Sequence, residues 1–139
     1  ETIDDAMFLG LKGLLLIGHI GKFIKLAAGV MNTHSRQADC RMEVFASHAA
    51  MAGADTDTVK EIMVCLNTTE AVEILKEKGL LRNVMQSVME RITFYLRQRA
   101  GEELEIGAVV FSNEEGILGQ TENAESLLQL TEKQRKEQE

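Results

Sequence analysis

The sequence predicts an α/β fold in which helices cover a sheet containing about two parallel strands. Apolar residues recur at helical spacing over most of the 139-residue chain, which indicates a helix-rich protein. Two segments differ: residues 14–17 are continuously apolar, and residues 104–111 are rich in strand-forming side chains. The chain contains no proline, in keeping with helices joined by short connections. Because two strands buried on both faces make no independent sheet, we expect further strands of that sheet in sequence not present here.

Periodicity and helix-ending residues predict the elements of the first part of the chain. We expect a helix over residues 2–9, a strand over 14–17, a turn at Gly18–Gly21 and a helix over 23–30. The order of strand, glycine-bounded turn and helix is one half of a βα unit. The polar stretch that follows, residues 32–36, predicts a loop or the entry to a helix over residues 38–52.

The same rules predict the second part of the chain. Asp57 or Thr58 is expected to cap the next helix, with Glu61 forming a capping box with Thr58. Asn67 and Thr68 are expected to cap the helix after that. The remaining elements are a helix over 70–78, a long helix over 81–100, the strand over 104–111, a loop over 112–119 and a last helix over 121–138 with a polar, frayed tail at 131–139.

The composition limits the classes of function. The chain has 22 acidic and 15 basic residues, a net charge of −7 and no Trp, which argues against nucleic acid as a partner. No segment has the roughly 20 apolar residues of a membrane span, so no membrane partner is expected. Cys40 and Cys65 form no paired motif, so we expect no protein-bound metal and a cytoplasmic, reducing compartment. The length fits a single domain over residues 1–139.

The distribution of acidic residues points to a binding surface. None of the 22 lies between residues 6 and 38. The same stretch holds basic and titratable side chains, namely Lys12, His19, Lys22, Lys25, His34 and Arg36. An acid-free stretch rich in hydrogen-bond donors, within an acidic protein, suggests a place where an anion binds.

The first candidate site is Gly18–Lys22, between the predicted strand and helix. Glycines let the backbone approach a ligand, and a helix start offers N–H groups to an anion. The pattern matches no P-loop, because Leu16 stands where one requires glycine, and it holds only the Gly-x-x-Gly half of a dinucleotide fingerprint. The alternative is a tight turn with a solvated Lys22.

The second candidate site is Asn32–Arg36, five consecutive hydrogen-bonding side chains. Arg36 could hold a carboxylate through two parallel hydrogen bonds, and His34 could exchange a proton near neutral pH. The alternative is a helix cap by one of these polar side chains, with Arg36 and Asp39 forming a surface ion pair. That alternative does not explain why residues 6–38 contain no acidic residue.

The third candidate site, Ser112–Glu114, follows the second predicted strand. In open α/β sheets, ligands bind beyond the carboxyl ends of the strands. Because Gly18–Lys22 also follows such an end, the two loops converge if the strands are parallel neighbours. A plain loop is the alternative. Four other chemically notable residues are interpreted as core or boundary residues: Cys40, His48, Met85 and Met89.

The chain resembles a known family at these residues. Residues 14–43 resemble the signature region of the cobalt-precorrin-5B methyltransferase family, CbiD, through two blocks at their mutual spacing: Gly18-His19-Ile20-Gly21-Lys22 and Asn32-Thr33-His34-Ser35-Arg36. Thr69–Ala71 and Gly107–Asn113 resemble the family too, so the resemblance spans nearly the whole chain. Family members are much longer, so the chain resembles their C-terminal part, and independent catalysis by this fragment is not expected.

The resemblance implies transfer of a methyl group from S-adenosylmethionine to ring carbon 1 of a cobalt-precorrin, in anaerobic cobalamin biosynthesis. The substrate is a tetrapyrrole with many carboxylates, which suits an acid-free, donor-rich surface. Methyl transfer mainly requires that donor and acceptor carbons are aligned and water is excluded.

The roles that follow are hypotheses. His34 is the candidate base if a proton leaves the macrocycle. The residues assigned to the cofactor are Gly18, His19, Gly21, Lys22 and Glu114, and those assigned to the tetrapyrrole are Asn32, Thr33, Ser35, Arg36, Asp39 and Asn113, with Asp39 orienting Arg36. Two other functions stay open: a non-catalytic interaction domain, whose amphipathic helices would serve a partner or a homo-oligomer, and a nucleotide-binding module of another chemistry.

Overall fold

The computed structural model describes residues 13–31 and 39–129. Among these residues a sheet is formed by β1 (Gly13–His19), β2 (Glu105–Ser112) and β3 (Gly116–Gln120), in the order β1-β2-β3. β1 and β2 run parallel, with His19 opposite Phe111, and β3 is antiparallel to β2. The predicted parallel pair is confirmed, and the α/β class with it, although β3 makes the sheet a mixed one.

β3 corrects the loop that was predicted over residues 112–119. The chain reverses at residues 113–115, where the Glu115 N–H donates to Ser112 Oγ over 3.0 Å and Gly116 adopts a positive φ of 73°. β3 is short and contains two glycines, so its own strand propensity is weak. Its extended conformation therefore depends on the hydrogen bonds with β2, which no local pattern reveals.

The helices lie close to their predicted positions. They are α2 (Ile20–Phe23), the 3-10 helix η1 (Ile24–Ala28), α3 (Arg41–Met51), α4 (Thr56–Met63), α5 (Thr68–Glu77), α6 (Leu81–Ala100) and a helical turn over residues 124–129. The predicted turn at Gly18–Gly21 is wrong: Gly18 and His19 belong to β1, and Gly21 lies in α2. The strand passes directly into the helix because the His19 side chain caps it, accepting a hydrogen bond from the Gly21 N–H over 2.9 Å.

One helix cap also differs from its prediction. Asp55 caps α4, because its carboxylate accepts from the Thr58 N–H over 2.8 Å, whereas Asp57 and Thr58 lie inside the helix. Asn67 caps α5 as predicted and accepts from the Glu70 N–H over 2.9 Å. Thr68, predicted to share that role, is the first residue of α5.

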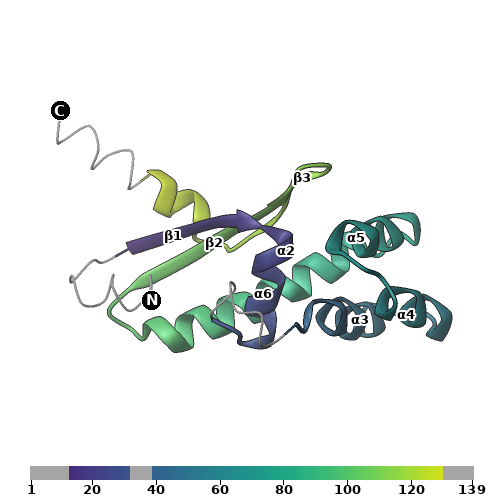
Figure 1. Cartoon of the computed structure of the whole chain (residues 1–139). Helices are drawn as coiled ribbons and strands as arrows, with labels where there is room; N and C mark the ends of the chain where they lie inside the picture. The colour runs from purple at the N-terminus through teal and green to yellow at the C-terminus, as the bar shows by residue number, and fades with distance from the viewer. Residues whose placement is uncertain (1–12, 32–38, 130–139) are drawn as a thin grey trace.

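A single hydrophobic core lies between the helices and one face of the sheet. Figure 1 shows α6 running along that face, with α3, α4 and α5 packed beyond the carboxyl ends of β1 and β2. Core side chains that are almost fully buried come from each layer: Ile20, Phe45, Ile62, Leu75, Val84, Val88, Ile92 and Val110. Met85 and Met89 belong to this core, as predicted, and His48 is buried beside it.

The opposite side of the sheet, the outer face, is only partly covered. It carries Leu15, Ile17, Val109, Phe111 and Ile117, which alternate with the core-facing residues of the same strands. Ile17 is 60% exposed and Ile117 is 65% exposed. The expectation that β1 is buried on both faces is therefore wrong.

The 124–129 helix packs on the amino-terminal part of this outer face (Figure 1). There Gly107 lies so close that a Cβ on it would come within 2.8 Å of Leu127 Cδ1. The predicted helix over residues 2–9, the polar stretch 32–36 and the last helix beyond residue 129 lie outside the described residues. Within the described part of the chain, no helix combines the length and apolar character needed to cross a lipid bilayer.

Candidate functional site

Two of the predicted loops meet at one end of the sheet. β1 ends at His19 and β2 at Ser112, and the parallel register sets His19 opposite Phe111. Because the strands are parallel neighbours, Gly18–Lys22 and the turn after Ser112 emerge from the same edge, as expected. The His19 and Phe111 rings are in edge-to-face contact, with centroids 5.8 Å apart, which fixes the position of the imidazole.

His19 has a defined hydrogen-bonding role. Its Nδ1 accepts from the Gly21 N–H, so in the neutral imidazole the proton resides on Nε2. Among the described residues, none forms a hydrogen bond with Nε2. The capping contact also takes up one of the helix N–H groups that were expected to face an anion. What remains for a ligand is a positioned Nε2–H donor at the end of the sheet.

The two glycines of this segment are explained by packing within the chain. A Cβ on Gly18 would lie 2.3 Å from Cε1 of Phe23, so glycine lets the Phe23 ring lie against β1. A Cβ on Gly21 would lie 3.1 Å from Nδ1 of His19, so glycine there makes room for the cap. Lys22 is exposed in the following turn. These glycines therefore have structural roles that do not depend on a ligand.

The β2–β3 side of this edge is polar. Asn113 and Glu114 are exposed, while Ser112 is 5% exposed and holds the turn. Glu115 forms an ion pair with Lys76 of α5, with 2.9 Å between its carboxylate oxygen and Lys76 Nζ.

The cavity that the described residues form between the two loops is very small. It measures about 10 Å³, roughly the space of one water molecule. Its lining residues are Ile20, Thr69, Val72, Glu73, Ser112, Glu114 and Glu115. The described residues thus bring several candidate side chains to one edge without enclosing a ligand there.

Asp39 forms an ion pair with a neighbour in sequence. Its two carboxylate oxygens lie 3.0 Å from Nε and 3.2 Å from Nη2 of Arg41, a two-point contact. These hydrogen bonds lower the pKa of Asp39, and the nearby charge of Lys25 lowers it slightly further. The predicted contact of Asp39 with Arg36 involves a residue outside the described part of the chain.

The rest of the predicted tetrapyrrole-binding group also lies outside the described residues. This holds for Asn32, Thr33, His34, Ser35 and Arg36. Their arrangement remains a prediction. The described residues that flank this stretch are Met31 and Asp39, next to η1 and α3.

A cavity of about 510 Å³ opens beside Cys40. It is lined by Ala27, Ala28, Cys40, Glu43, Val44, Ser47, His48, Met51 and Arg91. Burial, with a smaller contribution from the charge of Arg91, lowers the pKa of His48, whose Nδ1 is hydrogen-bonded to Ser87 Oγ. Burial raises the pKa of the Cys40 thiol. A neutral imidazole and a protonated thiol agree with the interpretation of both residues as structural.

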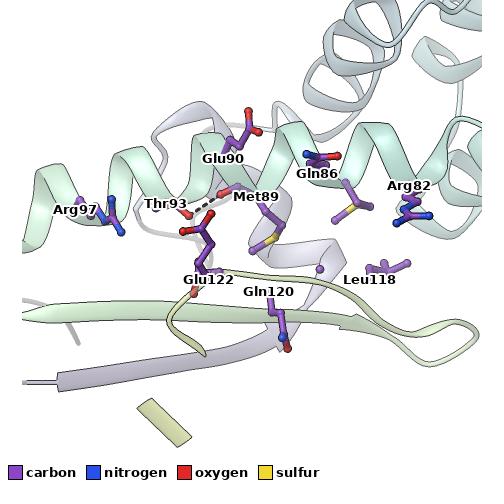
Figure 2. Close-up of a pocket in the computed structure, with 12 residues that line it drawn as sticks. Arg82, Gln86, Met89, Glu90, Thr93, Arg97, Leu118, Gln120 and Glu122 are labelled. Carbon is purple, nitrogen blue, oxygen red and sulfur yellow. Dashed lines mark hydrogen bonds between the residues drawn. The ribbon is translucent and has the colours of Figure 1, made fainter. Parts of the chain in front are cut away.

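A pocket of about 740 Å³ lies between α6 and β3 and contains none of the predicted site residues. Its floor is Met85, Met89 and Gly119. Figure 2 shows Met89 pointing from α6 toward β3, with Arg82 and Arg97 near the two ends of the row of lining side chains. This pocket was not predicted because β3, which forms one wall, was not predicted. Residues 13–31 and 39–129 contain no group of three or more His, Cys, Asp or Glu side chains that could hold a metal ion.

Comparison with known proteins places the chain in a family. The family model described as "CbiD, C-terminal domain" matches residues 32–122. The chain belongs to the CbiD family. The resemblance seen in the sequence is thereby confirmed over most of the chain.

Three curated relatives carry the name cobalt-precorrin-5B C(1)-methyltransferase. The protein of this name from Ruminiclostridium cellulolyticum is 47% identical over 81% of the CbiD-family chain and 29% of its own length. The Alkaliphilus metalliredigens protein is 36% identical over 92% of the chain and 34% of its own length, and the Clostridioides difficile protein is 34% identical over 92% and 32%. The chain therefore spans about a third of the length of these relatives. None of the solved structures matches it.

Proposed function

We propose that this chain supplies the C-terminal domain of an S-adenosylmethionine-dependent methyltransferase acting on ring carbon 1 of cobalt-precorrin-5B. The observation that carries this proposal is the 47% identity, over 81% of the chain, to the Ruminiclostridium cellulolyticum protein named for that reaction. The same name on relatives from two other organisms supports it.

The β1 side of the edge suits a substrate that carries many carboxylates, whereas Glu114 and Glu115 lie on its β2 side. The Nε2–H of His19 and the ammonium group of Lys22 are both hydrogen-bond donors, and the described part of the surrounding segment, residues 13–31, has no acidic side chain. Hydrogen bonds from fixed donors to carboxylates are stronger than those between neutral groups. We assign His19 and Lys22 to substrate or cofactor carboxylates, and Asn113 to the rim of the site.

The polar stretch before α3 is assigned to the tetrapyrrole. Asn32, Thr33, Ser35 and Arg36 would bind its edge. Asp39 lies at the end of this stretch, where its pairing with Arg41 keeps a carboxylate charge neutralised. His34 is proposed as the group that accepts a proton if one leaves the macrocycle.

The methyl donor fits the described residues only in part. Lys22 and His19 match its carboxylate chemically, and Glu114 could accept from ribose hydroxyls. However, the cavity between these loops, about 10 Å³, is far below the several hundred Å³ of a typical ligand site. We therefore assign no chemical step to the donor within this chain. The described residues would orient carboxylates, and further walls of the site, contributed from elsewhere, would exclude water.

A full-length chimera tests this function. The Alkaliphilus metalliredigens relative matches 92% of the chain, so its matched third can be replaced by residues 1–139. We expect the chimera to transfer labelled methyl from S-adenosylmethionine to cobalt-precorrin-5B, giving a product with one added methyl group at ring carbon 1. Loss of this activity in a folded chimera, with an active parent, would contradict the function. If His34→Ala and Arg36→Ala leave turnover unchanged, the assigned residues are wrong although the function stands.

A further inference from the structure

The outer face of the sheet carries a cluster of apolar side chains, bordered by His19 on β1 and Gln120 on β3. Strand register puts its members side by side: Ile17 is opposite Val109 on β2, and Phe111 is opposite Ile117 on β3. Leu15, Val109 and Phe111 are half-buried, whereas Ile17 and Ile117 are 60% and 65% exposed. Contiguous apolar surface of this kind marks interaction sites more often than isolated exposed residues do.

This face lacks the second covering layer that parallel strand pairs usually have. All-parallel sheets are covered on both faces, and although β3 makes this sheet a mixed one, β1 and β2 form such a parallel pair. Here α6 covers the core side, and the 124–129 helix covers the other side only near Gly107 (Figure 1). Among residues 13–31 and 39–129, none forms a layer over the outer side of the carboxyl-terminal half of β1 and the β2–β3 hairpin.

The candidate site adjoins this same surface. His19 lies in the row of β1 residues that faces outward, and its ring contacts Phe111 of the outer face. The small cavity between the two loops is not lined by His19, so a ligand held by His19 on the outer face needs a further wall. The relatives, of which this chain spans about a third, contain the additional chain from which such a wall could be built.

We propose that the outer face docks the part of a full-length CbiD enzyme that lies outside the matched domain, and that the ligand site at the ends of β1 and β2 lies along this boundary. The docking itself rests on family membership and on the uncovered sheet. The location of the ligand site along this boundary rests on the proposed function. The occupant is an apolar surface of the same polypeptide.

The test compares two pairs of substitutions in two proteins. Ile17→Lys with Ile117→Lys places charges on the outer face. Val64→Lys with Leu66→Lys is the matched control, because these residues are apolar, 77% and 83% exposed, and lie on the α4–α5 connection. Both pairs are made in the 139-residue chain and in the full-length chimera. We measure the melting temperature and the hydrogen exchange of the backbone amides at residues 13–19 and 116–120.

In the 139-residue chain we expect both pairs to change the melting temperature by less than about 2 °C, because the substituted side chains face solvent. In the chimera, exchange at β1 and β3 should be at least about 10-fold slower than in the isolated chain, since docked strands open less often. The sheet-face pair, Ile17→Lys with Ile117→Lys, should abolish this slow exchange. The control pair, Val64→Lys with Leu66→Lys, should keep it. Ile117→Thr serves as a milder variant if the double lysine variant does not fold.

Three results would overturn the proposal. One is equal exchange of β1 and β3 in the chimera and the isolated chain. Another is a chimera in which the sheet-face pair leaves exchange at β1 and β3 as slow as the control pair does. The third is an isolated chain that sediments as a dimer and becomes a monomer with the sheet-face pair, which would make a second copy the occupant. A chimera that docks but transfers no methyl group would contradict the proposed function and leave the docking intact.

Discussion

At the residue scale, the two ring nitrogens of His19 have separate roles, one in the fold and one in the proposed binding of carboxylates. Nδ1 accepts the Gly21 N–H and allows β1 to pass into α2 without a loop. The same bond sets the tautomer, so that Nε2 carries the proton and can only donate from the neutral ring. A substitution that keeps one function and removes the other can therefore separate them.

His19→Asn makes this separation, because an asparagine side chain at the cap position also accepts from the backbone. We expect the melting temperature of the chimera to be retained and its KM for the tetrapyrrole to rise about 10-fold or more, since a hydrogen bond to a charged group is lost. His19→Ala, in contrast, should also destabilise the fold by about 0.5–2 kcal/mol. A normal KM in His19→Asn would show that Nε2 does not contact the substrate.

His48 predicts a pH dependence of stability. Its pKa is lowered in the folded protein, so folding opposes protonation of the ring. The stabilisation that neutral His48 contributes is complete above the pKa of about 6.5 that the side chain has in the unfolded chain. It is lost as the pH falls from there toward the lower pKa of the folded state. We expect the urea midpoint to fall between pH 7.5 and pH 5, and His48→Gln to reduce this fall. Parallel pH curves for the two proteins would show that His48 does not contribute.

At the scale of elements, the start of α4 has two carboxylates, Asp55 and Asp57, that should contribute differently to stability. Asp55 accepts the Thr58 N–H, whereas Asp57 lies in the first turn and acts only through the helix dipole. We expect Asp55→Ala to lower the free energy of unfolding by about 1 kcal/mol, and Asp57→Ala to lower it by less than half as much. Urea unfolding measures both. Equal losses would favour the cap that the sequence predicted.

The contact between β3 and α6 depends on a glycine. A Cβ on Gly119 would lie 2.6 Å from Cγ of Met89, close to the helix backbone. Gly119→Ala should therefore cost about 1–3 kcal/mol of stability through overpacking. Met89→Ala made together with it should cost less than the sum of the single changes, because the side chain that clashes is gone. Strict additivity in this double-mutant cycle would contradict the contact.

The elements show which parts of the fold a sequence can predict. α6 and α5 were predicted because a long periodic apolar face and an asparagine cap are local signals. β1 and β2 were predicted as apolar runs near glycines, and their pairing followed. β3 was missed because its strand character comes from β2 rather than from its own residues. The Gly18–Gly21 turn was wrong because a cap by the side chain of His19 leaves no regular pattern.

The candidate site was predictable to a smaller extent. Parallel strand ends bring His19 and the Ser112 turn together, which follows from topology alone. The α6–β3 pocket depends on tertiary placement, which spacing does not encode. The contact of Asp39 with Arg41 is local, between residues two positions apart. The predicted contact of Asp39 with Arg36 stays a prediction.

At the scale of the whole molecule, the described residues bring part of a site to one edge without closing it. We expect the 139-residue chain by itself to show no methyl transfer from S-adenosylmethionine to cobalt-precorrin-5B, because the cavity between the candidate loops, about 10 Å³, cannot exclude water around two ligands. The measurement is product formation under conditions in which the chimera is active. Turnover by the isolated chain would show that its site is complete.

The pairing of β1 with β2 also has a consequence for folding. The two strands that carry the candidate loops are joined in register although their residues lie about ninety positions apart in the sequence. Contacts of such long range form late, because the entropy of closing so large a loop must be overcome first. The helices between them can assemble earlier from local contacts. A nascent or partly unfolded chain would thus already have helices but would not yet have the proposed site at the ends of β1 and β2, so binding at that site would report only on fully folded molecules.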